Sequence, residues 1–411
     1  MLLPMNPKLT ILFLAIIIVS CTNHKRKNQD KAVYNVSFEN CRTTIDLKLS
    51  DLVDSIKLVR LETTPESLIA NSPGIILTRD NIIVIDMNGI YKFTPEGRFV
   101  RKIIKFGRGP EELSPVIDYY FYERRNLLFI ADRIQNKDRF QIYDIEEEEF
   151  LEPVMKCFPG TWGDFLVYND SLIMGSMEPI RVDTNRYAMF IQNFKGELVT
   201  GMTNSRKVLD AVLNKETVQR LLFCQGEKDI FVYYVYDDTL FRFSNNNLSP
   251  YLIVSYNSQR NYMRSMGYEI GESRVGYPSV DNSSFILLNE SIYKGQSQSQ
   301  EDGWIKHNYD RYYYFLNKSD RSFSRIKSYT DNITGKMHEC NGKELNFPTV
   351  LPGNKICVLY NPYELSNDNS KENLSTLSDL SIQLQKIQEG LNPMDNPVLL
   401  IGSIKRKILT D

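Results

Sequence analysis

The chain has 411 residues, of which 42% are hydrophobic and 24% are charged, so it can bury a large core and is not intrinsically disordered. Its 49 Lys and Arg residues nearly balance 51 Asp and Glu residues, which excludes the basic excess expected of a general nucleic-acid binder. The 24 tyrosines and 21 phenylalanines favour strands. Three histidines and six cysteines do not favour an extended metal cluster, and no cofactor is expected.

The first element is an apolar run over residues 9–20. It is too short to cross a bilayer, which takes about 20 residues, but it suits the hydrophobic region of a secretory signal. The run ends in Ile-Val-Ser-Cys, which resembles the bacterial lipobox, whose Cys carries the lipid. We therefore expect residues 1–20 to be a lipoprotein signal peptide and Cys21 to be lipidated. An ordinary cleaved signal or an N-terminal membrane anchor is the alternative.

The segment after Cys21 is polar and mostly basic, and residues 21–49 are predicted to form a flexible tether and leader. Thr22 stands where an Asp typically retains lipoproteins in the inner membrane, so an outer-membrane lipoprotein of the cell envelope is expected, on either its periplasmic or its surface side. The other cysteines show no C-x-x-C spacing, and a Cys340–Cys357 disulfide is left open.

A repeat of about fifty residues follows, and each copy contains four short strands separated by polar turns. The last turn of each copy falls at Pro95-Glu96-Gly97, Glu146-Glu147, Lys195-Gly196, Asn245-Asn246 and, after a longer interval, Lys318-Ser319. A β-sandwich also has short strands, but it lacks this constant order and spacing. The pattern therefore predicts an all-β fold, a β-propeller of four-stranded antiparallel blades over residues 50–411.

The sixth blade is predicted from strands at residues 347–351, 355–360 and 398–405, completed by the early strand at residues 56–61. This pairing of the chain ends would close the ring. The polar insert at residues 295–303 is expected to be a loop. Leucines at helical spacing, from Leu374 to Leu391, predict one inserted C-terminal helix that packs across one end of the ring or on its outer edge.

Several motifs resemble those of the six-bladed β-propeller lipoproteins of Bacteroides-like bacteria, which are more distantly similar to NHL-type and TolB-like propellers. The motifs are the lipobox, residues 49–56 running into Arg-Leu-Glu-Thr-Thr at 60–64, Ile-Val-Ile-Asp at 83–86, residues 93–99, Phe-Gly-Arg-Gly-Pro-Glu-Glu at 106–112 and Asp-Asn-Pro-Val-Leu at 395–399. The family often has a second Gly-Glu pair where Glu112 stands. The resemblance implies a fold and a location, and no agreed biochemical activity.

Two sets of residues are candidates for ligand binding. Arg108 lies in a Gly-Arg-Gly-Pro sequence that suits either an anion or a turn between blades, but no Walker motif is present. Asp86, Asp132 and Asp237 each follow an apolar strand. They are expected either to cap turns through backbone N–H groups or to place carboxylates in the axial channel as a Ca²⁺ site. No metal-ligand set and no catalytic residue can be assigned.

Tyrosine clusters at residues 119–120, 233–234 and 312–314 could stack on sugars, but adjacent strand residues face opposite sides, so at least one of each cluster is expected in the blade core. Together these features predict a lipid-anchored binding or scaffold module for a glycan, a peptide or an envelope protein, attached to the membrane through its lipid. The alternative is a metal-dependent lactonase or esterase-like hydrolase that uses the axial channel.

Overall fold

The structure is a computed structural model of the chain. It describes residues 33–70, 73–107, 112–113, 118–132, 138–158, 162–177, 187–203, 221–225, 229–234, 239–244, 247–255, 274–281, 284–298, 305–331, 337–340, 348–351, 353–366 and 378–405. The predicted signal peptide and Cys21, which follows it, lie outside these residues.

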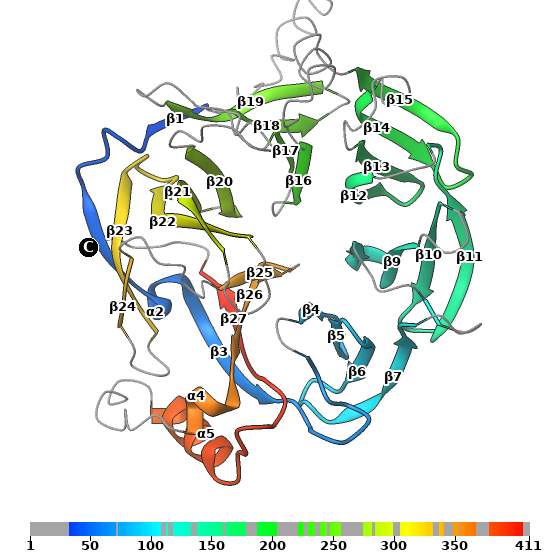
Figure 1. Cartoon of the computed structure of the whole chain (residues 1–411), viewed down its shortest axis with the longest axis vertical. Helices are drawn as coiled ribbons and strands as arrows, with labels where there is room; N and C mark the ends of the chain where they lie inside the picture. The colour runs from blue at the N-terminus through cyan, green and yellow to red at the C-terminus, as the bar shows by residue number, and fades with distance from the viewer. Residues whose placement is uncertain are drawn as a thin grey trace, which may run out of the picture.

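Six antiparallel blades of four core strands surround a common axis, and the six-bladed β-propeller predicted from the repeat is confirmed (Figure 1). Blade 1 contains β4 (Gly74–Leu77), β5 (Ile82–Asp86), β6 (Gly89–Phe93) and β7 (Phe99–Lys105). Blade 2 contains β8 (Tyr119–Tyr122), β9 (Leu127–Asp132), β10 (Arg139–Asp144) and β11 (Glu149–Met155). Blade 3 contains β12 (Trp162–Asn169), β13 (Leu172–Met177), β14 (Tyr187–Asn193) and β15 (Leu198–Thr203). In each of these blades the first strand lies nearest the axis.

The next two blades have the same order. Blade 4 contains β16 (Leu221–Gln225), β17 (Ile230–Tyr234), β18 (Thr239–Ser244) and β19 (Asn247–Ser255). Blade 5 contains β20 (Arg274–Asp281), β21 (Phe285–Gln298), β22 (Ile305–Asn317) and β23 (Phe323–Thr330), and β24 (Met337–Glu339) also pairs with β23. The residues of the insert up to Gln298 are therefore in a strand, and the loop expected at 295–303 is wrong for this part.

Blade 6 is built from both ends of the chain. β25 (Thr349–Leu351), β26 (Lys355–Tyr360) and β27 (Val398–Ile404) come from the C-terminal part, and β3 (Val53–Arg60) is the outer strand. β3 runs antiparallel to β27, with Leu58 opposite Leu400. The predicted closure of the ring by an early strand is thus confirmed.

The segment before β3 contributes three further elements to the fold. β1 (Tyr34–Ser37) pairs in parallel with β19, and β2 (Thr44–Lys48) pairs in parallel with β23, before the short helix α2 (Leu49–Leu52). Of residues 21–49, expected to form a tether and leader, 34–37 and 44–48 therefore extend the outer edges of blades 4 and 5. Their buried anchors are Val36, Phe38 and Leu47.

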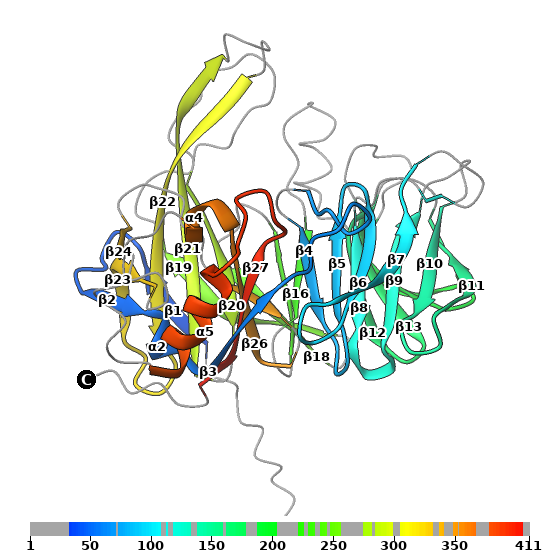
Figure 2. The ribbon, with the colours of Figure 1, turned by 90° about the horizontal axis from the view of Figure 1, so that it is seen from below.

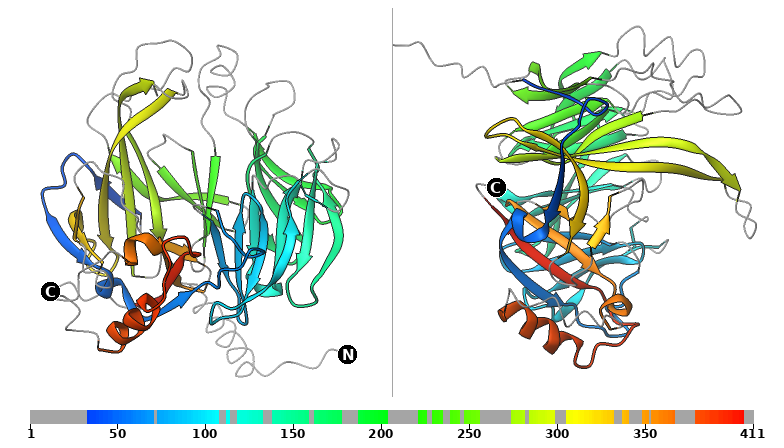
Figure 3. Two further views of the ribbon diagram at one scale, coloured as in Figure 1. Left: turned by 60° about the horizontal axis from the view of Figure 1, so that its bottom comes forward. Right: turned by 90° about the vertical axis from the view of Figure 1, so that its left-hand side faces the viewer.

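The inserted helix predicted near the C-terminus is α5 (Ser378–Gln388), preceded by the short α4 (Pro362–Ser366). It lies on the outer edge of blade 6, beside β3 (Figure 3). Leu380 and Leu384 are buried against Leu58, and the Leu58 N–H donates to Gln383 Oε1 at 3.4 Å. The helix therefore covers an edge that would otherwise present an unpaired backbone.

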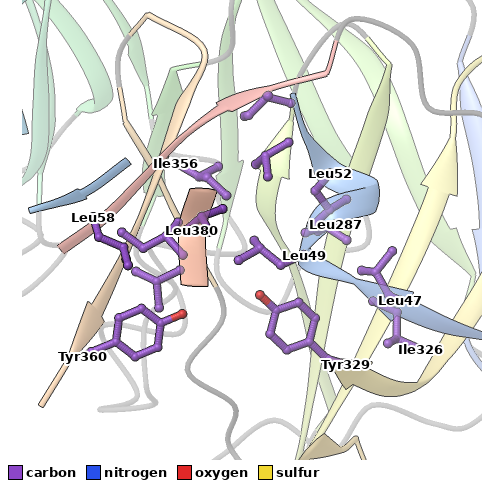
Figure 4. Close-up of a cluster of buried hydrophobic side chains, with 14 of the residues drawn as sticks. Leu47, Leu49, Leu52, Leu58, Leu287, Ile326, Tyr329, Ile356, Tyr360 and Leu380 are labelled. Carbon is purple, nitrogen blue, oxygen red and sulfur yellow. The ribbon is translucent and has the colours of Figure 1, made fainter. Parts of the chain in front are cut away.

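The hydrophobic core is divided into clusters that lie between neighbouring blades. Alternation along the strands produces this division, because successive side chains point to opposite faces. In β21, Phe285 and Leu287 pack towards blade 6, whereas Ile286 and Leu288 pack towards blade 4. Figure 4 shows the cluster between blades 5 and 6, which includes Leu49 and Tyr360. A single blade is therefore apolar on both faces and needs both neighbours.

Candidate functional site

The two ends of the ring are built differently. At one end, which we call the short-turn face, the third and fourth strands of four blades are joined by turns at residues 94–98, 145–148, 194–197 and 318–322. Each of these turns contains a residue with positive φ: Gly97, Glu148, Gly196 and Arg321. These are tight connections of fixed geometry, and they fall where the repeat predicted the last turn of a copy.

The opposite end, which we call the long-loop face, carries the connections from one blade to the next and those from second to third strands. In the sequence, the segments between the last strand of one blade and the first strand of the next include residues 106–118, 204–220, 256–273 and 331–348, the last of which contains β24. Loops held by a rigid sheet scaffold are the usual place for binding residues. The long-loop face is therefore the candidate functional face.

A two-stranded β-ribbon extends from blade 5 on this face. The strand β20 accompanies β21 only as far as the pair Arg274–Ile292, but β21 and β22 continue to pair up to Gln298–Ile305. The resulting two-stranded extension, residues 293–298 and 305–309, is called the arm here. Figure 2 shows it standing out from the end of the ring.

Asp86 lies at the end of β5, on the long-loop face, and is buried. Its Oδ2 accepts the N–H of Ala70 at 2.7 Å, and its Oδ1 accepts those of Asn88 at 2.7 Å and Gly89 at 3.0 Å. Asp86 therefore shapes the β5–β6 turn and holds the connection from blade 6 to blade 1. Burial raises the pKa of the neighbouring Tyr91 phenol to about 12, and the negative charge of Asp86 contributes to this rise.

Cys21, Arg108 and Asp237 lie outside the described residues, and of Asp132 only the backbone is described, at the end of β9 opposite Arg139. Gly107, beside Arg108, is held by its N–H donating to the Leu113 carbonyl at 2.9 Å. Within the parts of the chain that the structure describes, no group of three His, Cys, Asp or Glu residues could hold a metal ion.

The tyrosine clusters contribute largely to contacts between blades. Tyr313 packs in the cluster between blades 5 and 6, and Tyr314 in the cluster between blades 4 and 5. Tyr312 lies under the Arg325 guanidinium, 4.3 Å from its ring centroid. Tyr119 is directed at Gly74 on the neighbouring innermost strand, where a Cβ atom would meet its hydroxyl oxygen at 1.9 Å.

The cysteines that the structure describes are free thiols. Cys340 and Cys357 belong to different clusters, so the disulfide left open by the sequence is not formed. Burial raises the pKa of each of these two thiols to about 12, and neither is a reactive thiolate at neutral pH.

A carboxylate that the sequence pattern did not single out lies near the axis. Asp164 on β12 accepts the N–H of Phe223, on the innermost strand of the next blade, at 2.7 Å, and its own strand's Phe165 N–H at 2.8 Å. Burial raises its pKa to about 6, although the two backbone hydrogen bonds act in the opposite direction. The sequence shows that Asp164 lies at the start of the third repeat. It does not show that the N–H of Phe223, fifty-nine residues later, donates a hydrogen bond to it.

Three of the family motifs meet where the ring closes, between blades 6 and 1. The buried Asn396 side chain donates to the carbonyls of Glu62 and Ser67 at 2.8 Å, and accepts the Ile69 N–H at 2.9 Å. The Gly97 carbonyl accepts the Glu62 N–H at 2.8 Å. The motifs that carried the resemblance at these positions therefore hold the ring together.

The ring and its unlike faces define the chain as a six-bladed β-propeller in which the strand ends joined by the longer connections lie at one end. It belongs to the family described as "Domain of unknown function (DUF4934)", whose model matches residues 33–403. Together with the comparison that follows, this confirms the family type indicated by the sequence motifs. No curated protein matches the chain.

Solved structures are similar in fold. An exported protein of Bacteroides fragilis is 14% identical, with a TM-score of 0.61, over 91% of this chain and 100% of that one. A member of the DUF4221 family from Bacteroides vulgatus is 10% identical, with a TM-score of 0.47, over 86% of this chain and 98% of that one. None of the helices among the described residues is long and apolar enough to cross a membrane.

Proposed function

We propose that the protein is a lipid-anchored binding or scaffold module of the cell envelope, whose partner contacts the long-loop face and the arm. The observation that carries the proposal is the difference between the two ends of one ring. The short-turn face is fixed by tight turns, whereas the long-loop face bears the long connections and a ribbon that extends beyond the blade. An isolated two-stranded ribbon has little stability in water, so a partner that covers the arm would stabilise it.

The location rests on two supports. The lipobox-like sequence ends at Cys21, and the structurally similar protein of Bacteroides fragilis is described as exported. We propose the outer membrane as the site of attachment. Metabolic labelling with a fatty-acid probe tests this: the wild type should be labelled and Cys21→Ala should not, whereas equal labelling of both would contradict lipidation.

The hydrolase alternative has no specific support. Both carboxylate oxygens of Asp86 already accept backbone N–H groups, so this residue acts as a turn cap in the described structure. A propeller fold does not by itself imply chemistry.

Binding can be tested by a thermal-shift screen of the protein against glycans, peptides and, separately, divalent ions, because a ligand of the folded state raises Tm. The matched variant replaces residues 294–308 by Asn-Gly, which closes the hairpin directly above the Tyr293–Tyr309 pair. We expect this variant to keep the Tm of the free protein and to lose the shift given by the glycan or peptide. A shift that survives in the variant would place binding elsewhere, and a response to Ca²⁺ accompanied by ester hydrolysis would favour the enzyme.

A further inference from the structure

Among the residues that the structure describes, chain segments cover the outer edges of three of the six blades. β1 covers β19 in blade 4, β2 covers β23 in blade 5, and α5 lies along β3 in blade 6. Among the described residues, no strand pairs with the outer edges of β7, β11 and β15 in blades 1 to 3. An uncovered edge offers backbone N–H and C=O groups to any extended chain.

Two of these three edges carry the features that prevent pairing. β7 contains Arg101, Lys102 and Lys105, and β11 contains Glu149, Glu152 and Pro153. Charged residues on an edge strand repel a like strand, and proline removes a hydrogen-bond donor from the ladder. These two edges are therefore protected against a second copy of themselves.

The third edge lacks this protection. β15 has the sequence Leu-Val-Thr-Gly-Met-Thr, without a charge or a proline. Its first two side chains, Leu198 and Val199, are 40% and 54% exposed. Val199 is the extra residue of a bulge against β14, and the regular ladder runs from Thr200 to Met202, where a second irregularity precedes the Tyr187–Thr203 pair.

We propose that β15 pairs antiparallel with β15 of a second copy, with Thr200 next to the two-fold axis, so that two third blades form one continuous sheet. A two-fold axis brings a strand against itself, so a strand whose charges all have one sign places like charges near one another. On β7 and β11 this would oppose cations to cations and carboxylates to carboxylates, whereas on β15 it opposes only Leu, Val, Thr, Gly and Met. The lack of charge thus fits a second copy better than a partner selected by its charge.

The first test measures the mass of the full-length protein in detergent by light scattering as a function of concentration. We expect a dimer for the wild type and at least tenfold weaker association for Thr200→Lys, since this places two ammonium groups near the axis. Val100→Lys on β7 is the matched control, because Val100 is 46% exposed on the corresponding strand of blade 1, and it should remain dimeric. A wild type that is monomeric throughout, or a dimer indifferent to Thr200→Lys, would overturn the proposal.

A second test does not depend on the folding of the lysine variant. Thr200→Cys in intact cells should give a disulfide-linked dimer on mild oxidation, since facing residues in an antiparallel pair approach within disulfide range. Val100→Cys should give none. Equal cross-linking of the two variants would show random collision and would contradict the pairing, and so would no cross-linking of Thr200→Cys.

Discussion

The carboxylate of Glu62 accepts the backbone N–H of Phe99 at 2.7 Å, and this contact joins the end of blade 6 to the outer strand of blade 1. Glu62 is also bound through its own N–H and carbonyl, to Gly97 and Asn396 respectively. One residue therefore connects the N-terminal strand, the first repeat and the segment before the last strand.

Asn396→Ala should lower the free energy of unfolding by about 2–4 kcal/mol, because it leaves buried backbone groups of the 62–69 segment without their partners. Urea denaturation measures the change. Met394→Ala is the control two residues away; Met394 is 83% exposed, so this change should cost less than about 0.5 kcal/mol. Similar losses in the two variants would show that the side chain of Asn396 does not secure the closure.

Gly97→Ala should be much more destabilising than Gly390→Ala. Both residues have positive φ, +87° and +90°, so both substitutions carry the strain of this conformation, about 1 kcal/mol. At Gly97 the new Cβ would also lie 2.1 Å from the Arg60 carbonyl oxygen, whereas at Gly390 nothing lies within 4 Å. We expect a difference of about 2 kcal/mol or more in thermal or urea unfolding. Equal effects would mean that β3 does not approach this turn.

The raised pKa of Asp164, about 6 against an ordinary 3.8, predicts a pH dependence of stability. The folded state binds the proton more tightly than the unfolded state, so the stability contributed by this group is full below pH 3.8 and is lost as pH rises towards 6. From pH 4.5 to 7 the wild type should therefore lose more stability than Asp164→Asn, by about 2 kcal/mol at most. Asp320, whose pKa is lowered by hydrogen bonds from Ser322, titrates below this window, and Asp320→Asn should follow the wild type. If stability changes with pH in the same way in the wild type and in Asp164→Asn, the pKa of Asp164 is not raised in the folded protein.

Phe38→Ala should destabilise the protein by about 3 kcal/mol, although this residue lies in the stretch that the sequence suggested was a leader. Phe38 is 4% exposed and stacks on Tyr314, with ring centroids 4.4 Å apart. Tyr363→Ala, an aromatic removed from a 60% exposed position, should change stability little. Urea unfolding compares the two. No loss with Phe38→Ala would mean that the segment is a tether after all.

The blades could be predicted from the sequence because their information is local. Runs such as Ile82–Asp86 alternate between two apolar interfaces, and Gly97 and Gly196 mark turns at the spacing of the repeat. The pairing of β3 was also predictable, since an alternating strand was left over at one end and a three-stranded blade at the other.

What could not be predicted depends on partners distant in sequence. Tyr34–Ser37 is too short and too polar to read as a strand, and it is one because β19 offers an edge to it. The Gly, Gln and Ser of residues 295–298 indicate a loop, but the ladder that starts at Phe285 continues through them. Similarly, an Asp that follows an apolar strand shows the same sequence pattern whether it caps a turn or binds a metal ion. The two are distinguished for Asp86 by the three backbone N–H groups that occupy both carboxylate oxygens, one of which comes from Ala70, sixteen residues earlier.

The closure of the ring also fixes the order in which the protein can be completed. β3 leaves the ribosome among the first segments of the fold, whereas its partner β27 ends at Ile404, near the C-terminus. Until the first repeat has been synthesised, Val59 and Leu61 lack the neighbouring side chain of Phe93. Until β27 has been synthesised, they still lack that of Leu399. Blades 1 to 5 can stack as they emerge, but the last contact is the one of greatest sequence separation and the slowest to form. A nascent chain that stalls before β27 leaves an apolar strand unpaired, and it is this intermediate that chaperones and proteases would meet.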